Sequence, residues 1–354
     1  MKFNKIILTI LVSTLLVYCS KNKNDASIDF GTAPKQLNAD QELASKTFGV
    51  ISDVAYNAEN TDSPDKVYLG KALYHDTRLS STGNNSCNSC HNLDTYGVDN
   101  QSFSTGDNGG KGGRNSPTTF NAAAHFVQFW DGRAKDVEEQ AGGPVLNPAE
   151  MAMPSENEVI NRLKKTDFYL ALFQKAFPND KDPMTFTNMR KAIAAFERTL
   201  MTKSRFDKYM DGDAKALTNE EIAGMKKFID VGCASCHSGA TVGGQSYQKF
   251  GVYEPYEKYT KSAKVDNGRM DVTKNEADKF MFKVPSLRNV EKTYPYFHDG
   301  SIKDLNEAVK IMAKVQLNKN LTDAEVNQIT SFMKALTADI PSEAKQIPKE
   351  IALK

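Results

Sequence analysis

Two five-residue stretches, Cys87-Asn-Ser-Cys90-His91 and Cys233-Ala-Ser-Cys236-His237, contain four of the five cysteines of the chain. Two cysteines three residues apart can form thioether bonds to the two vinyl groups of a haem, and the histidine that follows is placed to coordinate the iron. A zinc site or a redox disulfide would also use a Cys-x-x-Cys pair, but neither requires a histidine directly after it. The repeated pattern therefore predicts two covalently bound haem c groups, with His91 and His237 as iron ligands.

The length and charge of the chain fit two domains of ordinary size. The sequence has 354 residues, and its 45 Lys and Arg against 44 Asp and Glu give a formal net charge of +1. Each haem motif can therefore have a hydrophobic core of its own. The near-zero charge gives no indication of binding to nucleic acid or to an anionic membrane surface.

The beginning of the chain has the pattern of an export signal. Two lysines lie within the first five residues, and the apolar run over 6–17 is too short to span a bilayer securely. Cys19 follows this run, as in a lipoprotein signal, although Tyr18 occupies a place where a small residue is usual. We expect residues 1–19 to be the signal, with a periplasmic location and a lipid anchor at Cys19. Simple cleavage and an uncleaved anchor are the alternatives.

Helix signals dominate the rest of the chain. Capping boxes at Ser155-x-x-Glu158, Thr218-x-x-Glu221 and Thr322-x-x-Glu325 precede apolar residues at helical spacing. No convincing run of alternating strand residues appears. The sequence predicts a mainly α fold, made of two cytochrome c-like haem domains with long loops and little β-structure. The expected segments are a flexible polar tether over 20–60, an N-terminal domain over 61–203, a C-terminal domain over 204–340 and a tail over 341–354.

Several strings occur in order around the haem motifs, among them Leu69-Gly-Lys-x-Leu73, Gln128-Phe-Trp-Asp-Gly-Arg133, Asn147-Pro-Ala-Glu-Met151 and Lys283-Val-Pro-Ser-Leu-Arg-Asn289. Over residues 62–340 the chain resembles the bacterial di-haem cytochrome c peroxidase family, which includes methylamine-utilisation relatives. The resemblance implies an enzyme that reduces hydrogen peroxide to water. Its expected electron donor is a small protein, such as a monohaem cytochrome c or a cupredoxin. Members of that family are often homodimers.

The resemblance implies different tasks for the two irons. Met312 matches the methionine ligand of the haem that receives electrons, whose other ligand would be His237. A thioether ligand favours ferrous iron and so suits an entry site for electrons. Gln128 and Glu138 match the polar pair beside the peroxidatic haem, which His91 would hold. There a carboxylate can move a proton from one peroxide oxygen to the other, while the glutamine orients the peroxide.

The resemblance also implies a calcium ion between the two domains. Asn115 matches a ligand that acts through its side-chain amide, and Thr293 and Pro295 match ligands that act through backbone carbonyls. Neutral oxygens of this kind suit calcium. Turn formation alone would also explain Asn115 and Pro295.

One position departs from the family pattern. Many members have a histidine that caps the peroxidatic iron in the oxidised state, where this chain has Asp107 in Ser104-Thr-Gly-Asp107. A carboxylate is a weaker ligand, and the surrounding glycines suggest a mobile surface loop. We therefore expect the oxidised first haem to be five-coordinate or water-bound and active without prior reduction. His125 is the reserve ligand, although we expect it to be a hydrogen-bonded packing residue instead.

Two other functions are compatible with these residues. The same fold could oxidise another substrate or a partner protein, or it could be a di-haem electron carrier without catalysis. The presence of Gln128 and Glu138 argues against a pure carrier, because electron transfer needs no acid–base group beside an open iron.

Overall fold

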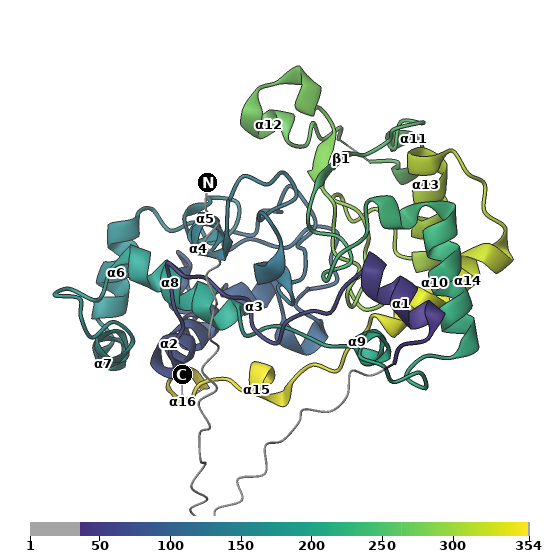
Figure 1. Cartoon of the computed structure of the whole chain (residues 1–354). Helices are drawn as coiled ribbons and strands as arrows, with labels where there is room; N and C mark the ends of the chain where they lie inside the picture. Colours follow the sequence, from purple (N-terminus) through teal and green to yellow (C-terminus); the bar gives the residue numbers. More distant parts are fainter. Residues whose placement is uncertain (1–35, 263, 353–354) are drawn as a thin grey trace, which may run out of the picture. The chain divides into compact units, whose positions relative to one another are not determined.

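The computed structural model describes residues 36–262 and 264–352. Helices make up most of its regular structure, as Figure 1 shows. The α-helices are α1 (Ala39–Thr47), α2 (Pro64–His75), α3 (Cys87–Cys90), α4 (Val137–Gln140), α5 (Gly143–Leu146), α6 (Glu156–Lys164), α7 (Asp167–Ala176), α8 (Phe186–Glu197), α9 (Arg205–Met210), α10 (Asn219–Val231), α11 (Glu257–Thr260), α12 (Met270–Thr273), α13 (Leu305–Leu317), α14 (Asp323–Ala335), α15 (Ser342–Lys345) and α16 (Lys349–Ala352). Short 3-10 turns are η1 (Thr77–Leu79), η2 (Leu93–Thr95), η3 (Ala122–Ala124), η4 (Cys233–Ser235) and η5 (Glu276–Asp278). The prediction of a mainly α fold is confirmed.

The helix starts that the capping boxes predict are all present. Ser155 is the N-cap of α6, and its hydroxyl accepts a hydrogen bond from the backbone N–H of Glu158 at 3.2 Å. Thr218 and Thr322 begin α10 and α14, each with both hydrogen bonds of a capping box. Such a cap satisfies backbone donors that have no partner inside the helix.

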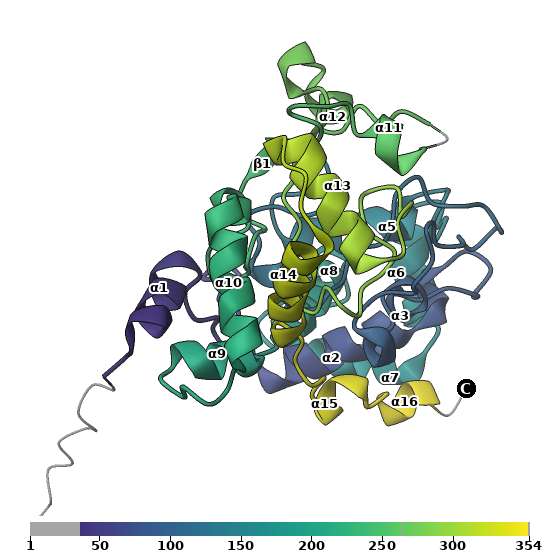
Figure 2. The same cartoon turned by 90° about the vertical axis from the view of Figure 1, so that its right-hand side faces the viewer.

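Each half of the chain contains two helices that cross at a glycine. A Cβ on Gly70 of α2 would lie 1.8 Å from the carbonyl oxygen of Ala192 in α8. A Cβ on Gly224 of α10 would lie 1.9 Å from the carbonyl oxygen of Gln328 in α14. Figure 2 shows α10 and α14 side by side, with α13 next to α14. Only glycine allows the two backbones to approach so closely.

Buried apolar side chains lie around both crossings. The first core contains residues from α2, α6, α7 and α8, including Leu69, Leu73, Val159, Phe173 and Ile193. The second core contains residues from α9, α10 and α14, including Phe206, Met225, Phe228, Ile329 and Phe332. Each half therefore has a core of its own, as expected for two haem domains.

Both ends of the described chain are folded onto these cores. Residues 39–47, inside the expected tether, form α1, and Ala44 and Phe48 are buried in the second core. The tether prediction is wrong for this part, because one short apolar face in a polar sequence is enough to dock the helix. The expected tail also packs: Ile351 joins the first core, and the Tyr68 hydroxyl donates to Glu350 Oε2 at 2.6 Å.

A small β-ribbon of the second half contacts a loop of the first half. β1 (Tyr247–Lys249) pairs antiparallel with β2 (Met281–Lys283), so that Tyr247 lies opposite Lys283. The backbone N–H of Lys283 donates to the Trp130 carbonyl at 2.7 Å, and that of Phe126 donates to the Gly244 carbonyl at 3.1 Å. The stretch that carries Gln128 and Trp130 is therefore attached to the second half.

Across residues 36–262 and 264–352, no helix is long and apolar enough to cross a membrane. The expected signal over 1–19, with Cys19, lies outside the described residues.

We predict that Gly224→Ala lowers the free energy of unfolding by roughly 1–3 kcal/mol, because the added methyl group must push α10 away from α14. Gly110→Ala is the matched control, since a Cβ there would meet no atom within 4 Å. Urea unfolding of both variants measures the difference. Equal stability of the two variants would show that the helices do not pack as closely as described.

Candidate haem sites and the cavity that joins them

One cavity of about 1160 Å³ is lined by both Cys-x-x-Cys-His motifs. This volume exceeds the roughly 300–1,000 Å³ of a site for one small ligand. Cys87, Cys90, Cys233 and Cys236 are all free thiols that line it. The cavity and its four thiols therefore fit two covalently attached haems, and His91 and His237 line the same space.

The first motif forms one helical turn followed by its histidine. α3 holds Cys87 and Cys90, and the backbone N–H of His91 donates to the Cys87 carbonyl at 2.9 Å. The ring Nδ1 of His91 lies 2.9 Å from the carbonyl oxygen of Pro117, to which it donates when Nδ1 carries the proton. That bond leaves Nε2 unprotonated for a metal. Burial lowers the pKa of His91, which favours this neutral ring.

The second motif directly follows α10. Gly232 ends the helix with a φ of 106°, a left-handed conformation suited to glycine, and the chain then turns through η4 into His237. Burial lowers the pKa of His237 to about 4, so its ring is neutral and able to bind a metal.

Met312 lies on the side of α13 that faces the cavity. The residues of α13 that line the cavity follow helical spacing, namely Leu305, Ala308, Val309, Met312, Ala313, Gln316 and Leu317. Met312 therefore belongs to a continuous helix face that lines the same cavity as His237. Its role as the second ligand of that haem stays a prediction.

The two expected acid–base residues have different surroundings in the structure. Gln128 is buried, lines the cavity and donates its side-chain amide to the Ala122 carbonyl at 2.9 Å. Glu138 is not among the residues that line the cavity. Its Oε1 accepts hydrogen bonds from the side-chain amides of Asn57 and Asn60, each at 3.0 Å, and forms an ion pair with Arg198.

These contacts engage one carboxylate oxygen and do not test the expected role of Glu138 beside the peroxidatic haem, so that role stays a prediction. Its carboxylate anchors α4, because the Arg198 guanidinium attracts it and two amides from the segment before α2 donate to it. Its other oxygen, Oε2, is buried and has no hydrogen-bond partner among the described residues. Glu139, its neighbour on α4, accepts from the backbone N–H of Lys135 at 2.9 Å.

A different carboxyl and amide from the next part of the chain line the cavity. Glu150 and Gln140 both lie at its wall, together with Pro144 and Asn147. Asn147 donates its side-chain amide to Glu150 Oε1 at 3.1 Å. Burial raises the pKa of Glu150, and the positive charge of Arg133 opposes this only in part. Gln140 and Glu150 are ten residues apart, as are Gln128 and Glu138, so the spacing alone could not distinguish the two pairs.

Glu197 is a second carboxyl at the cavity that sequence reasoning missed. It ends α8, is buried and lines the cavity with Cys87. Burial, together with the negative charge of Glu138, raises the pKa of Glu197 to about 8. Glu197 is therefore largely protonated at neutral pH, a state that no motif in the sequence indicated.

Asp107 does not face the cavity. It is buried, and its carboxylate accepts hydrogen bonds from the backbone N–H groups of Thr82 at 2.5 Å and Asn84 at 3.2 Å. Gly106 packs against the Ala149 carbonyl, where a Cβ would lie only 2.1 Å away. The loop is therefore held in place rather than mobile, and Asp107 is engaged as a turn residue, which excludes it as an iron ligand in this conformation.

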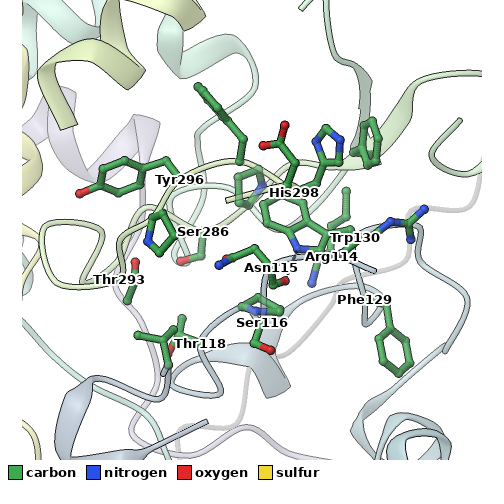
Figure 3. A pocket seen from close by; sticks show the side chains of 18 of the residues that line it. Arg114, Asn115, Ser116, Thr118, Phe129, Trp130, Ser286, Thr293, Tyr296 and His298 are labelled. Carbon is green, nitrogen blue, oxygen red and sulfur yellow. Dashed lines mark hydrogen bonds between the residues drawn. The ribbon is translucent and has the colours of Figure 1, made fainter. Parts of the chain in front are cut away.

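The three expected calcium ligands line one cavity. Asn115 lies beside Trp130, whose indole N–H donates to the Asn115 carbonyl at 2.9 Å, and Thr293 lines the same space (Figure 3). Asn115 donates its side-chain amide to the Gln101 carbonyl at 2.9 Å, which leaves its Oδ1 available. Pro295 also lines the cavity. All three residues are therefore accessible from the same cavity.

Comparison with known proteins agrees with this architecture. The di-haem cytochrome c peroxidase family model matches residues 64–215, and the cytochrome c model matches residues 222–337. The chain is 47% identical over 286 residues to a cytochrome c551 peroxidase from Nitrosomonas europaea, covering 80% of this chain and 83% of that protein. It is 42% identical over 317 residues to one from Pseudomonas aeruginosa, covering 89% and 91%.

More distant relatives include proteins of methylamine utilization. The methylamine utilization protein MauG of Methylorubrum extorquens is 34% identical over 258 residues, which cover 72% of this chain and 70% of that protein. A crystal structure of a MauG-like protein associated with microbial copper homeostasis has a TM-score of 0.74 at 27% identity, covering 84% of this chain and 97% of that one. Two haem motifs at one cavity, two helical cores and similarity over most of the chain lead to one conclusion: the chain belongs to the di-haem cytochrome c peroxidase family.

Proposed function

We propose that this protein reduces hydrogen peroxide to two waters with electrons from a small donor protein, such as a monohaem cytochrome c or a cupredoxin. The observation that carries the proposal is the half-buried carboxyl of Glu150, which lies with the Gln140 amide at the cavity that both haem motifs line. Electron transfer alone needs no such group, so a pure electron carrier is disfavoured.

When bound, the two haems supply the electron storage and transfer that peroxide reduction needs. His91 would hold the first haem from one side. His237 and Met312 would hold the second haem, and the thioether of Met312 would favour its reduced state. The second haem is accordingly the proposed entry point for electrons.

In the proposal, side chains that line the cavity carry out the proton transfers. Reduction of one peroxide to two waters consumes two electrons and two protons. In the proposal, Glu150 takes a proton from one peroxide oxygen and returns it to the other as the O–O bond breaks. Gln140 donates or accepts a hydrogen bond that orients the peroxide. The Asn147 amide, at 3.1 Å from Glu150 Oε1, holds the carboxyl in position.

The contacts of Asp107 and His125 bear on whether peroxide can reach the first iron. Asp107, at the position where many relatives have a capping histidine, is occupied by the backbone donors of Thr82 and Asn84. His125, the reserve ligand, has its Nδ1 3.2 Å from the ammonium of Lys283. We therefore propose that the first iron keeps an open or water-bound position when oxidised, so the enzyme needs no prior reduction.

We also propose a calcium ion near Asn115, Thr293 and Pro295. These residues come from both halves of the chain and line one cavity. The turn that contains Thr293 is held to the first half by Asn100, whose side-chain amide donates to the Tyr294 carbonyl at 2.7 Å. A cation bound to neutral oxygens here would fasten the two haem domains together.

The proposed location is the periplasm, with the protein anchored to the membrane through Cys19. The support is the signal pattern over residues 1–19 and the extracytoplasmic attachment of haem c. Labelling with a radioactive fatty acid distinguishes lipidation at Cys19 from simple cleavage of the signal. If Cys19 is lipidated, the wild-type protein takes up the label and the Cys19→Ser variant does not. If the signal is simply cleaved, neither protein takes up the label.

We predict that Glu150→Gln lowers kcat/KM for peroxide by roughly 10²–10⁴-fold while both haems stay attached, because the amide cannot accept the proton. Wild-type turnover should fall as the pH drops through the raised pKa of Glu150, and the variant should lack this acid limb. Glu139→Gln, at an exposed carboxylate of the same helix, is the matched control and should keep its turnover, whereas Glu138→Gln tests the other candidate base. A collapse in Glu138→Gln with normal turnover in Glu150→Gln would return the role to Glu138.

A second prediction concerns calcium. Dialysis of the haem-loaded protein against a calcium chelator should lower both its thermal midpoint and its peroxide turnover, and added calcium should restore them. Asn115→Leu should respond less to the chelator, since it has already lost one ligand. If chelation changes neither quantity in the wild-type protein, the calcium proposal is wrong.

A further inference from the structure

Lys283 is a buried cation without an anionic partner in the described chain. It lies on β2 with 5% of its surface exposed, and its side chain lines the cavity. No Asp or Glu among residues 36–262 and 264–352 forms an ion pair with it; its one side-chain partner is His125. An unpaired buried charge is costly, so such a cation indicates a missing anion.

Asp131, the acid whose charge acts on Lys283, already has other partners. Asp131 accepts from Arg114 Nη1 at 2.5 Å and from Arg133 Nη1 at 3.0 Å. Burial lowers the pKa of Lys283 to about 8, and the charge of Asp131 opposes this only in part. Lys283 is therefore mostly protonated at neutral pH and still lacks a direct counter-ion.

His125 adds a second donor at the same place. Its Nδ1 lies 3.2 Å from Lys283 Nζ, and because an ammonium can only donate, Nδ1 must be the acceptor. The proton of the neutral ring then sits on Nε2, which is buried and has no hydrogen-bond partner among the described residues. The ring is held against Gly244, where a Cβ would lie 2.5 Å from His125 Cδ2.

The pair therefore presents an ammonium and a ring N–H, with no acceptor, at a cavity that fits two haems. Each haem has two propionate carboxylates, which are its only anionic side groups. We propose that Lys283 and His125 bind a propionate of the haem attached at Cys233 and Cys236. A carboxylate has two oxygens and can accept from both donors at once.

The assignment to the second haem follows from the chain around Lys283. Gly243 packs against both Pro285, which lies two residues after Lys283, and the ring of His237. A Cβ on Gly243 would lie 2.5 Å from the Pro285 carbonyl oxygen and 3.1 Å from His237 Nδ1. His125 belongs to the first half and Lys283 to the second. The propionate would therefore also tie the two halves together.

The test is resonance Raman spectroscopy and a redox titration of the haem-loaded protein. Lys283→Met should shift the propionate bending mode of one haem and lower the midpoint potential of the Met312-ligated haem, because an unneutralised carboxylate favours ferric iron. Lys283→Arg should keep both close to the wild-type values. Lys279→Met, which removes an exposed lysine near the same ribbon, is the matched control and should change neither.

His125→Phe removes the second donor without changing charge and remains informative if Lys283→Met does not fold. It should shift the bending mode in the same direction. Unchanged bending modes and midpoints in folded Lys283→Met or His125→Phe would overturn the proposal, and changes confined to the first haem would overturn its assignment. The inference rests on haem attachment and not on peroxidase activity, so a failure of the Glu150 test leaves it standing.

Discussion

Two histidine ligands held at a single cavity are the constraint on which the rest of this structure depends. His91 follows a helical turn and is oriented by the Pro117 carbonyl, whereas His237 follows a helix that ends at Gly232. The two hydrophobic cores form around helix pairs outside the cavity, where Gly70 and Gly224 allow close crossing. Short regular elements and long loops leave room for two large planar groups between the cores.

The two sides of the cavity then differ in chemistry. Around the second motif, one face of α13 provides apolar residues and the Met312 thioether. Around the first motif, the wall contains Gln140, Glu150 and Glu197, which can hydrogen-bond and exchange protons. A sulfur-ligated iron stores an electron, while an iron beside a carboxyl can support O–O cleavage. This difference is the physical basis of the proposed peroxidase.

Glu138 has a structural task that its position in the sequence does not reveal. It lies on the same short helix as Gln140, and its carboxylate joins that helix to Arg198 at the end of α8. Arg190 also donates to its backbone carbonyl at 2.7 Å. The ion pair thus positions Gln140 at the cavity from the opposite side of the helix. Loss of this ion pair would act on the site through the placement of α4.

The haem motifs and the capped helices could be predicted from sequence because each depends on residues close together in the chain. The spacing of Gln128 and Glu138, from which the acid–base pair was predicted, is the same as that of Gln140 and Glu150, and only the fold shows that the second pair lines the cavity. Asp107 resembled a weak ligand in a mobile loop, yet backbone donors 23 and 25 residues earlier in the chain bind it. The docking of α1 and the contact of Lys283 with His125 likewise depend on segments that are distant in the sequence.

Electron paramagnetic resonance of the fully oxidised, haem-loaded protein tests the central claim most directly. The account predicts one high-spin ferric signal from the first haem, whose second axial position is not filled by a protein side chain, and one low-spin signal from the haem between His237 and Met312. Two low-spin signals with no high-spin component would contradict the account, because both irons would then be closed by protein ligands.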